Sequence, residues 1–72
     1  MSYLIPANIN DFLIISSDMA KTKDKNVYVF MNRETKKIFI TNEKDIKENE
    51  LEIFAVFFPD GNFKVEVKNE TL

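Results

Sequence analysis

The chain has 72 residues, of which 44% are hydrophobic and 31% charged, a composition typical of one small globular domain and not of a disordered segment. It contains no cysteine and no histidine, which excludes disulfides, thiolate nucleophiles, histidine bases and nearly every zinc site. Its formal net charge is -2, whereas domains that bind the phosphate backbone usually carry a positive excess. Nucleic acid is therefore the less expected partner.

The longest apolar runs lie at residues 12–15 and 53–58. Both are far shorter than the roughly 20 residues that a membrane helix needs. The first residues also lack the basic and apolar segments of a secretory signal. We therefore expect a cytoplasmic protein with no membrane association.

Amino acids with A/T-rich codons (Phe, Tyr, Met, Ile, Asn and Lys) account for 37 residues, and those with G/C-rich codons (Gly, Ala, Arg and Pro) account for 7. This bias indicates a gene from an A/T-rich genome. We interpret the source of the gene as a low-GC bacterium, or a phage or plasmid that lives in one.

Residues 8–20 fit two interpretations. Their apolar and small residues lie on one stripe of a helix, formed by Ile9, Phe12, Leu13, Ser16, Met19 and Ala20. Asn8 or Asn10 is a suitable cap for the start of that helix. The run from residue 12 to residue 15 is also typical of a short strand. We favour the helix, followed by a charged loop over residues 21–26.

Two β-hairpins are predicted after this segment. The first joins residues 27–31 to residues 38–41 through a polar turn without glycine, in which Asn32 or Lys36 supplies any left-handed residue. The second joins residues 51–58 to residues 63–67, and its turn contains Gly61, the only glycine, for which we expect a positive φ. Between the hairpins, the polar residues 42–50 are expected to form one short helical turn.

These elements predict a single α+β domain over residues 1–72, with a four-stranded, mainly antiparallel sheet and one N-terminal helix. The alternative is a small all-β barrel in which residues 11–16 form a fifth strand. Large apolar side chains occur on both sides of the predicted strands, whereas a sheet with one wet face alternates cleanly between apolar and polar residues. One short helix covers only one face, so the chain itself or a second chain must cover the other.

No catalytic, cofactor-binding or metal-binding residue is predicted. The carboxylates lie in the most polar segments beside lysines, and Ser16 and Ser17 have no general base to activate them. The sequence therefore favours a protein that is not an enzyme and uses no cofactor.

The large aromatic residues of the strands suggest a binding surface, because exposed apolar patches usually mark interfaces. The candidate partner-binding residues are Tyr28, Phe30, Phe39, Phe54 and Phe58. The favoured function is a small binding protein, such as an accessory or inhibitor factor, that contacts a protein partner or a second copy of itself as a homodimer.

The alternative function is binding of single-stranded nucleic acid. Small sheets bind single strands by stacking bases on surface aromatics. Lys21, Lys23 and Lys25 precede the aromatic strand at residues 27–31 and would contact the phosphates.

Overall fold

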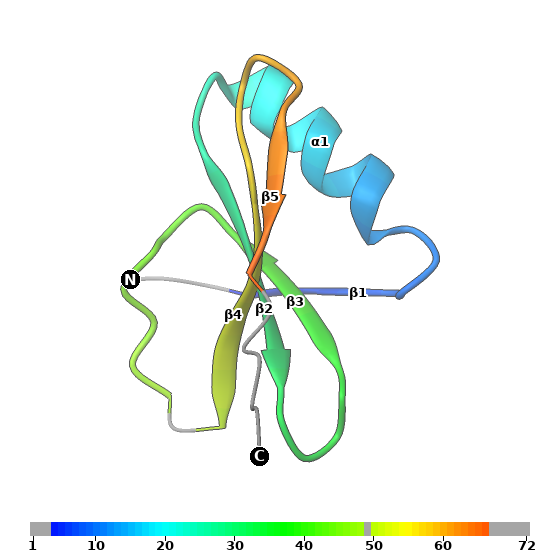
Figure 1. The fold of residues 1–72 in the computed structure, drawn as a ribbon, viewed down its shortest axis with the longest axis vertical. Helices are drawn as coiled ribbons and strands as arrows, with labels where there is room; N and C mark the ends of the chain where they lie inside the picture. The colour runs from blue at the N-terminus through cyan, green and yellow to red at the C-terminus, as the bar shows by residue number, and fades with distance from the viewer. Residues whose placement is uncertain (1–3, 49, 67–72) are drawn as a thin grey trace.

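One helix packs against one face of a five-stranded antiparallel sheet in the computed structural model, which describes residues 4–48 and 50–66 (Figure 1). The elements are β1 (Ile5–Ala7), α1 (Phe12–Lys23), β2 (Val27–Asn32), β3 (Ile38–Thr41), β4 (Leu51–Phe57) and β5 (Phe63–Val65). The strand order is β1-β3-β2-β4-β5, and the sheet is open. The predicted α+β class is confirmed. The predicted number of four strands is wrong, and so is the barrel alternative, because the segment at residues 12–16 is helical.

The additional strand is β1, which pairs antiparallel with β3 so that Ile5 lies opposite Ile40 and Ala7 opposite Ile38. It escaped prediction because it has only three residues and contains Pro6, which has no N–H and is typical of edge strands. In Figure 1, β1 runs across the picture while β2, β4 and β5 run along its long axis, so the sheet is strongly twisted.

Both predicted hairpins are present, and residue 67 of the second predicted hairpin lies outside the described residues. In the first turn, Lys36 takes the left-handed conformation with φ 65°. The Asn32 side chain stabilises this turn, because its Oδ1 accepts hydrogen bonds from the backbone N–H groups of Glu34 (2.8 Å) and Thr35 (3.0 Å).

The prediction of a helical turn between the hairpins is wrong. In the described part of this segment, residues 42–48 and 50, there is no helix. A segment with Ile46 as its only apolar side chain has no face that could anchor a helix.

The second turn is built around Gly61, whose φ is +97°, as predicted. Replacing Gly61 by valine should lower the free energy of unfolding by about 1–2 kcal/mol, because a β-branched residue is strained at positive φ. Gly61→Asn is the matched control and should lose less, since asparagine tolerates this region better. Urea denaturation measures the stability of both variants. An unchanged urea midpoint for the valine variant would contradict the positive φ at Gly61.

The helix α1 begins after Asp11 and ends at Lys23; the next residue, Asp24, has φ 55° and donates its N–H to the carbonyl oxygen of Ala20. Lys21 and Lys23 therefore lie in the last helical turn and not in the loop expected over residues 21–26. Cations are favourable there because the carbonyl end of a helix carries partial negative charge.

The core lies between α1 and the sheet. Phe12, Ser16 and Ala20 are the buried helix residues, one turn apart on the same face. They meet the buried strand residues Val27, Val29, Ile38, Ile40, Ala55 and Phe57. The predicted helical stripe is therefore only partly confirmed, because Ile9 and Leu13 remain exposed.

An aromatic row extends this core to the edge of the sheet. The Phe12 ring lies 5.6 Å from the Phe54 ring and 6.3 Å from the Phe57 ring, measured between centroids. The Phe57 ring stacks on the Phe63 ring of β5 at 5.4 Å. A register shift between β2 and β4 makes this row possible: Val29 pairs with Ala55 but Phe30 pairs with Ile53, so Phe54 is the extra residue of a bulge.

The face of the sheet away from α1 is also largely buried. Phe30 is 5% exposed, and Val56 and Thr41 are buried as well. Figure 1 shows the segment that joins β3 to β4 on the opposite side of the sheet from α1. Much of both faces of the sheet is thus buried within a single chain.

Ser16 has an unusual position in this core, because its Oγ is fully buried and has no hydrogen-bond partner among the described residues. An unsatisfied buried hydroxyl costs about 1–3 kcal/mol, and alanine is the better helix former. Ser16→Ala should therefore raise the free energy of unfolding by about 1 kcal/mol and the melting temperature by about 4–8 °C. Ser17→Ala, at the half-buried neighbouring position, is the control and should gain less. Equal gains in a thermal melt would show that the Ser16 hydroxyl is already paired.

Candidate interaction surface

The outer face of α1 and of the turn before it is apolar where a surface helix is normally polar. Its four large exposed side chains are between 40% and 74% accessible to solvent: Ile9, Leu13, Ile14 and Ile15. Because α1 turns Phe12 and Ser16 toward the sheet, the three positions between them, Leu13, Ile14 and Ile15, are left exposed. We call these four residues the helix patch.

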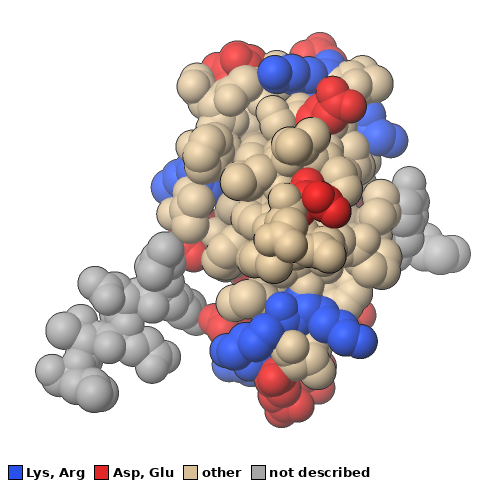
Figure 2. Space-filling model, turned by 90° about the vertical axis from the view of Figure 1, so that its right-hand side faces the viewer, with Lys and Arg blue, Asp and Glu red and all other residues tan. Residues whose placement is uncertain are grey.

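Figure 2 shows this side of the molecule. Uncharged surface extends across its centre with acidic side chains among it, while lysine and arginine lie mainly toward the two ends. Asp11 and Asp18 are exposed and lie three or four residues from Ile14, so these carboxylates lie beside Ile14 on the outer face of the helix. Leu13, Ile14, Ser17, Asp18 and Lys21 line a shallow, open depression on the same face. The surface is therefore broad and largely apolar, with acidic side chains among the apolar ones.

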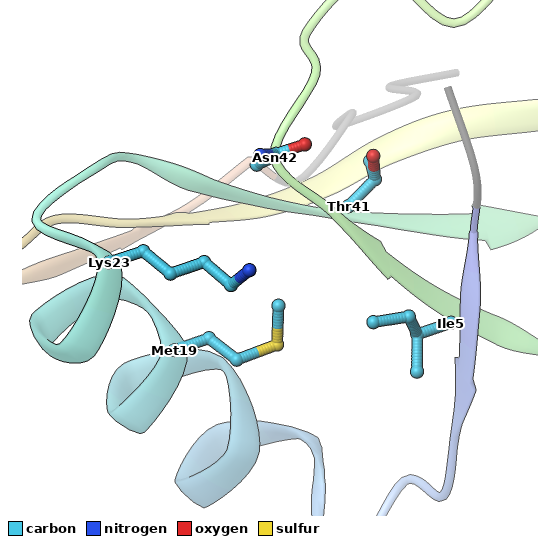
Figure 3. Close-up of a pocket in the computed structure, with 5 residues that line it drawn as sticks. All are labelled: Ile5, Met19, Lys23, Thr41 and Asn42. Carbon is cyan, nitrogen blue, oxygen red and sulfur yellow. The ribbon is translucent and has the colours of Figure 1, made fainter. Parts of the chain in front are cut away.

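A second, smaller pocket lies between α1 and the β1–β3 edge (Figure 3). Figure 3 shows Met19 and Lys23 extending from α1 toward Ile5 of β1, with Thr41 and Asn42 at the end of β3. The space has room for about one water molecule. It is too small to bind a metabolite.

The edge strand β5 adds two exposed apolar side chains on the face that carries α1. Phe63 is 54% exposed and Val65 is 45% exposed. Val65 pairs with the core residue Ala55, and Phe63 stacks on the buried Phe57. The aromatic row thus ends in solvent at this edge.

The structure does not bring the five predicted partner-binding aromatics together on one exposed face. Tyr28, Phe30 and Phe39 alternate with core residues of β2 and β3, and so project from the face opposite α1. Phe54 lies on the helix side, against Phe12. Phe58 is half-buried at the end of β4. Phe30 is buried, and the other four are intermediate in exposure.

The three predicted lysines lie around the end of α1. Lys21 and Lys23 are in its last turn, and Lys25 follows the left-handed Asp24. All three are exposed. The Cε of Lys21 would lie 3.7 Å from a Cβ placed on Gly61, so Lys21 reaches toward the β4–β5 turn, whereas Lys23 lines the small pocket of Figure 3.

Sequence reasoning missed the helix patch. Ile14 and Ile15 lie outside the predicted apolar stripe, and a helix with isoleucines off its buried stripe carries apolar surface that its own sheet cannot cover. These isoleucines outside the buried stripe are the sequence feature from which the helix patch could have been predicted. The feature was ambiguous because the same run of residues is also typical of a strand.

Among residues 4–48 and 50–66, no three aspartate or glutamate side chains come together as a metal site. No helix in this part of the chain is long and apolar enough to span a membrane. Comparisons of the chain with protein-family models, curated protein sequences and solved structures gave no match.

Proposed function

We propose that the protein is a small, non-catalytic binding protein that acts through a protein–protein surface, and that the helix patch is this surface. The observation that carries the proposal is the exposure of Ile14, at 74%, beside three further large apolar side chains. Fully burying such a side chain is worth about 1.5–3 kcal/mol, so these four residues could supply much of the free energy of a specific complex.

The carboxylates of this face suggest the chemistry of the partner. Asp11 and Asp18 lie beside Ile14, and acidic side chains are also visible within this face in Figure 2. A fitting partner has an apolar groove or face with lysine or arginine placed opposite these carboxylates, because complementary charges speed association and discriminate against wrong partners. Such a surface suits an accessory or inhibitor factor that covers a site on a larger protein.

The test replaces Ile14 by lysine. We expect stability to be unchanged, because Ile14 faces solvent and lysine is at least as good a helix former. We expect binding to be lost, because the patch would have to bury a charge. Tagged wild-type and variant proteins, incubated with lysate of a low-GC bacterium, are compared by quantitative mass spectrometry of the captured proteins.

Thr22→Lys is the matched control, since it introduces the same side chain at an exposed position on the last turn of the same helix. A protein captured by wild type and by Thr22→Lys, but not by Ile14→Lys, supports the proposal and identifies the partner. Equal capture by all three proteins, or no specific capture by wild type, contradicts it.

Single-strand binding has less support. Phe30 is buried and Tyr28 and Phe39 are half-buried, which leaves little aromatic face for stacked bases. Salt-dependent binding of a short oligonucleotide, lost when Lys21, Lys23 and Lys25 are replaced, would favour binding of single-stranded nucleic acid.

The proposed function also includes a cytoplasmic location and a phage, plasmid or low-GC bacterial origin. Both rest on the sequence alone.

A further inference from the structure

We propose that the protein forms a two-fold symmetric dimer in which the β5 strands of two copies pair antiparallel, with Val65 opposite Val65 of the partner. This inference goes beyond the proposed function, because it uses the open edge of the sheet and not the helix patch. The partner is a second copy of this chain.

The two edges of the sheet differ in what they offer another strand. The β1 edge contains Pro6, which has no N–H to donate and so discourages pairing. The β5 edge has no proline, and residues 63–66 are all exposed. Of the two edges, only β5 has an uninterrupted row of backbone N–H groups.

The hydrogen bonds to β4 show which backbone groups of β5 point outward. The carbonyl oxygen of Asn62 accepts a bond from the N–H of Phe58 (2.9 Å), and the N–H of Glu66 donates to the carbonyl oxygen of Phe54 (2.8 Å). Backbone direction alternates along an antiparallel strand, so Lys64 also faces β4 while Phe63 and Val65 face away. Val65 can therefore exchange two hydrogen bonds with Val65 of a second copy across a two-fold axis.

The charges on β5 select this register. With Val65 on the axis, Lys64 lies opposite Glu66 of the partner, and Glu66 opposite the partner's Lys64. These are non-hydrogen-bonded positions, where opposed side chains are closest. Within one chain the two side chains already form an ion pair, with Lys64 Nζ 3.7 Å from Glu66 Oε2. Placing Lys64 or Glu66 on the axis would oppose like charges, and placing Phe63 there would oppose Lys64 to the uncharged Asn62, so among these positions opposite charges meet only with Val65 on the axis.

The other side of the strand favours the same arrangement. Phe63 and Val65 both project from the face that carries α1, and both are about half exposed. Pairing about the axis brings the two Val65 side chains together with a Phe63 on each side. The aromatic row of each subunit then continues into apolar surface of its partner instead of ending in solvent.

Sedimentation equilibrium from micromolar to millimolar concentration measures the association. We expect wild type to approach twice the monomer mass of 8.5 kDa at the upper end, since small interfaces bind weakly. Val65→Pro removes the outward N–H but none of the bonds to β4, and should remain folded and monomeric. A wild type that stays monomeric throughout overturns the proposal.

Charge reversal tests the register without changing the backbone. Lys64→Glu and Glu66→Lys each place like charges opposite one another twice, and each should weaken dimerisation by about tenfold. The double variant restores opposite charges and should recover the wild-type dissociation constant. Circular dichroism checks that all variants are folded. Weakening by the single changes without recovery in the double variant overturns this register.

Ile14→Lys separates this inference from the proposed function. It should abolish capture of a partner but leave dimerisation intact, because Ile14 lies on α1 and not on β5. A dimer lost in Ile14→Lys but kept in Val65→Pro would place the interface on the helix patch and overturn the inference. Failure of the β5 dimer leaves the capture experiment, and hence the proposed function, unaffected.

Discussion

Replacing Phe12 by alanine is expected to remove about 3–5 kcal/mol from the free energy of unfolding. Phe12 is buried, and its ring contacts both Phe54 and Phe57, so it joins α1 to the aromatic row of β4. A domain of this length has a total stability of only about 4–10 kcal/mol. The variant should therefore unfold at a much lower urea concentration, as measured by circular dichroism, with an unchanged slope m.

Leu13→Ala is the control for this experiment, because Leu13 is the next residue of the helix and is exposed. Its expected loss is below about 1 kcal/mol, as for most surface substitutions. Similar losses for Phe12→Ala and Leu13→Ala would mean that α1 is rotated about its axis relative to the structure described above.

Replacing Phe30 by alanine should also cost about 3–5 kcal/mol. Phe30 is 5% exposed on the sheet face away from α1, between Phe39 of β3 and Ile53 of β4. This result would identify Phe30 as a core residue and separate it from the partner-binding role that the sequence suggests. Thermal and urea denaturation of the dilute protein measure the loss without contributions from self-association.

Phe63→Ala provides the comparison, since Phe63 is 54% exposed and makes one ring stacking contact, with Phe57. Its loss should be well under half that of Phe30→Ala, because the cost of truncation follows the buried contacts removed. If Phe30→Ala were tolerated as well as Phe63→Ala, the face away from α1 would be open and available to a partner.

The strands were predictable where two local signals agreed. In β4 and β5 the alternation of apolar residues coincides with a turn that contains the only glycine, and in β2 and β3 with a polar turn. The strand β1 has neither signal: its three residues are held by pairing with Ile38 and Ile40, which lie more than 30 positions away. Pairing at that separation leaves no local periodicity to detect.

The binding surface was less predictable, because it depends on how the elements pack. The sequence shows that both faces of the strands are apolar, but the strand order and the bulge at Phe54 decide which aromatics are buried. Similarly, the rotation of α1 decides that Phe12 is buried while Ile14 is exposed. The strand order, the bulge and the rotation of α1 depend on tertiary packing, and residue patterns within one element do not determine them.

The central place of β2 has a consequence for the order in which the sheet assembles. β2 reaches β3 through a turn of only five residues, whereas β4 must return across nine residues to pair with the other side of β2. Closing a longer loop costs more chain entropy, and non-local contacts slow folding. We therefore expect the β2–β3 hairpin to form first. We expect β4 to extend it on one side and β1 to join last on the other, because the segment between β1 and β3 is the longest loop to close.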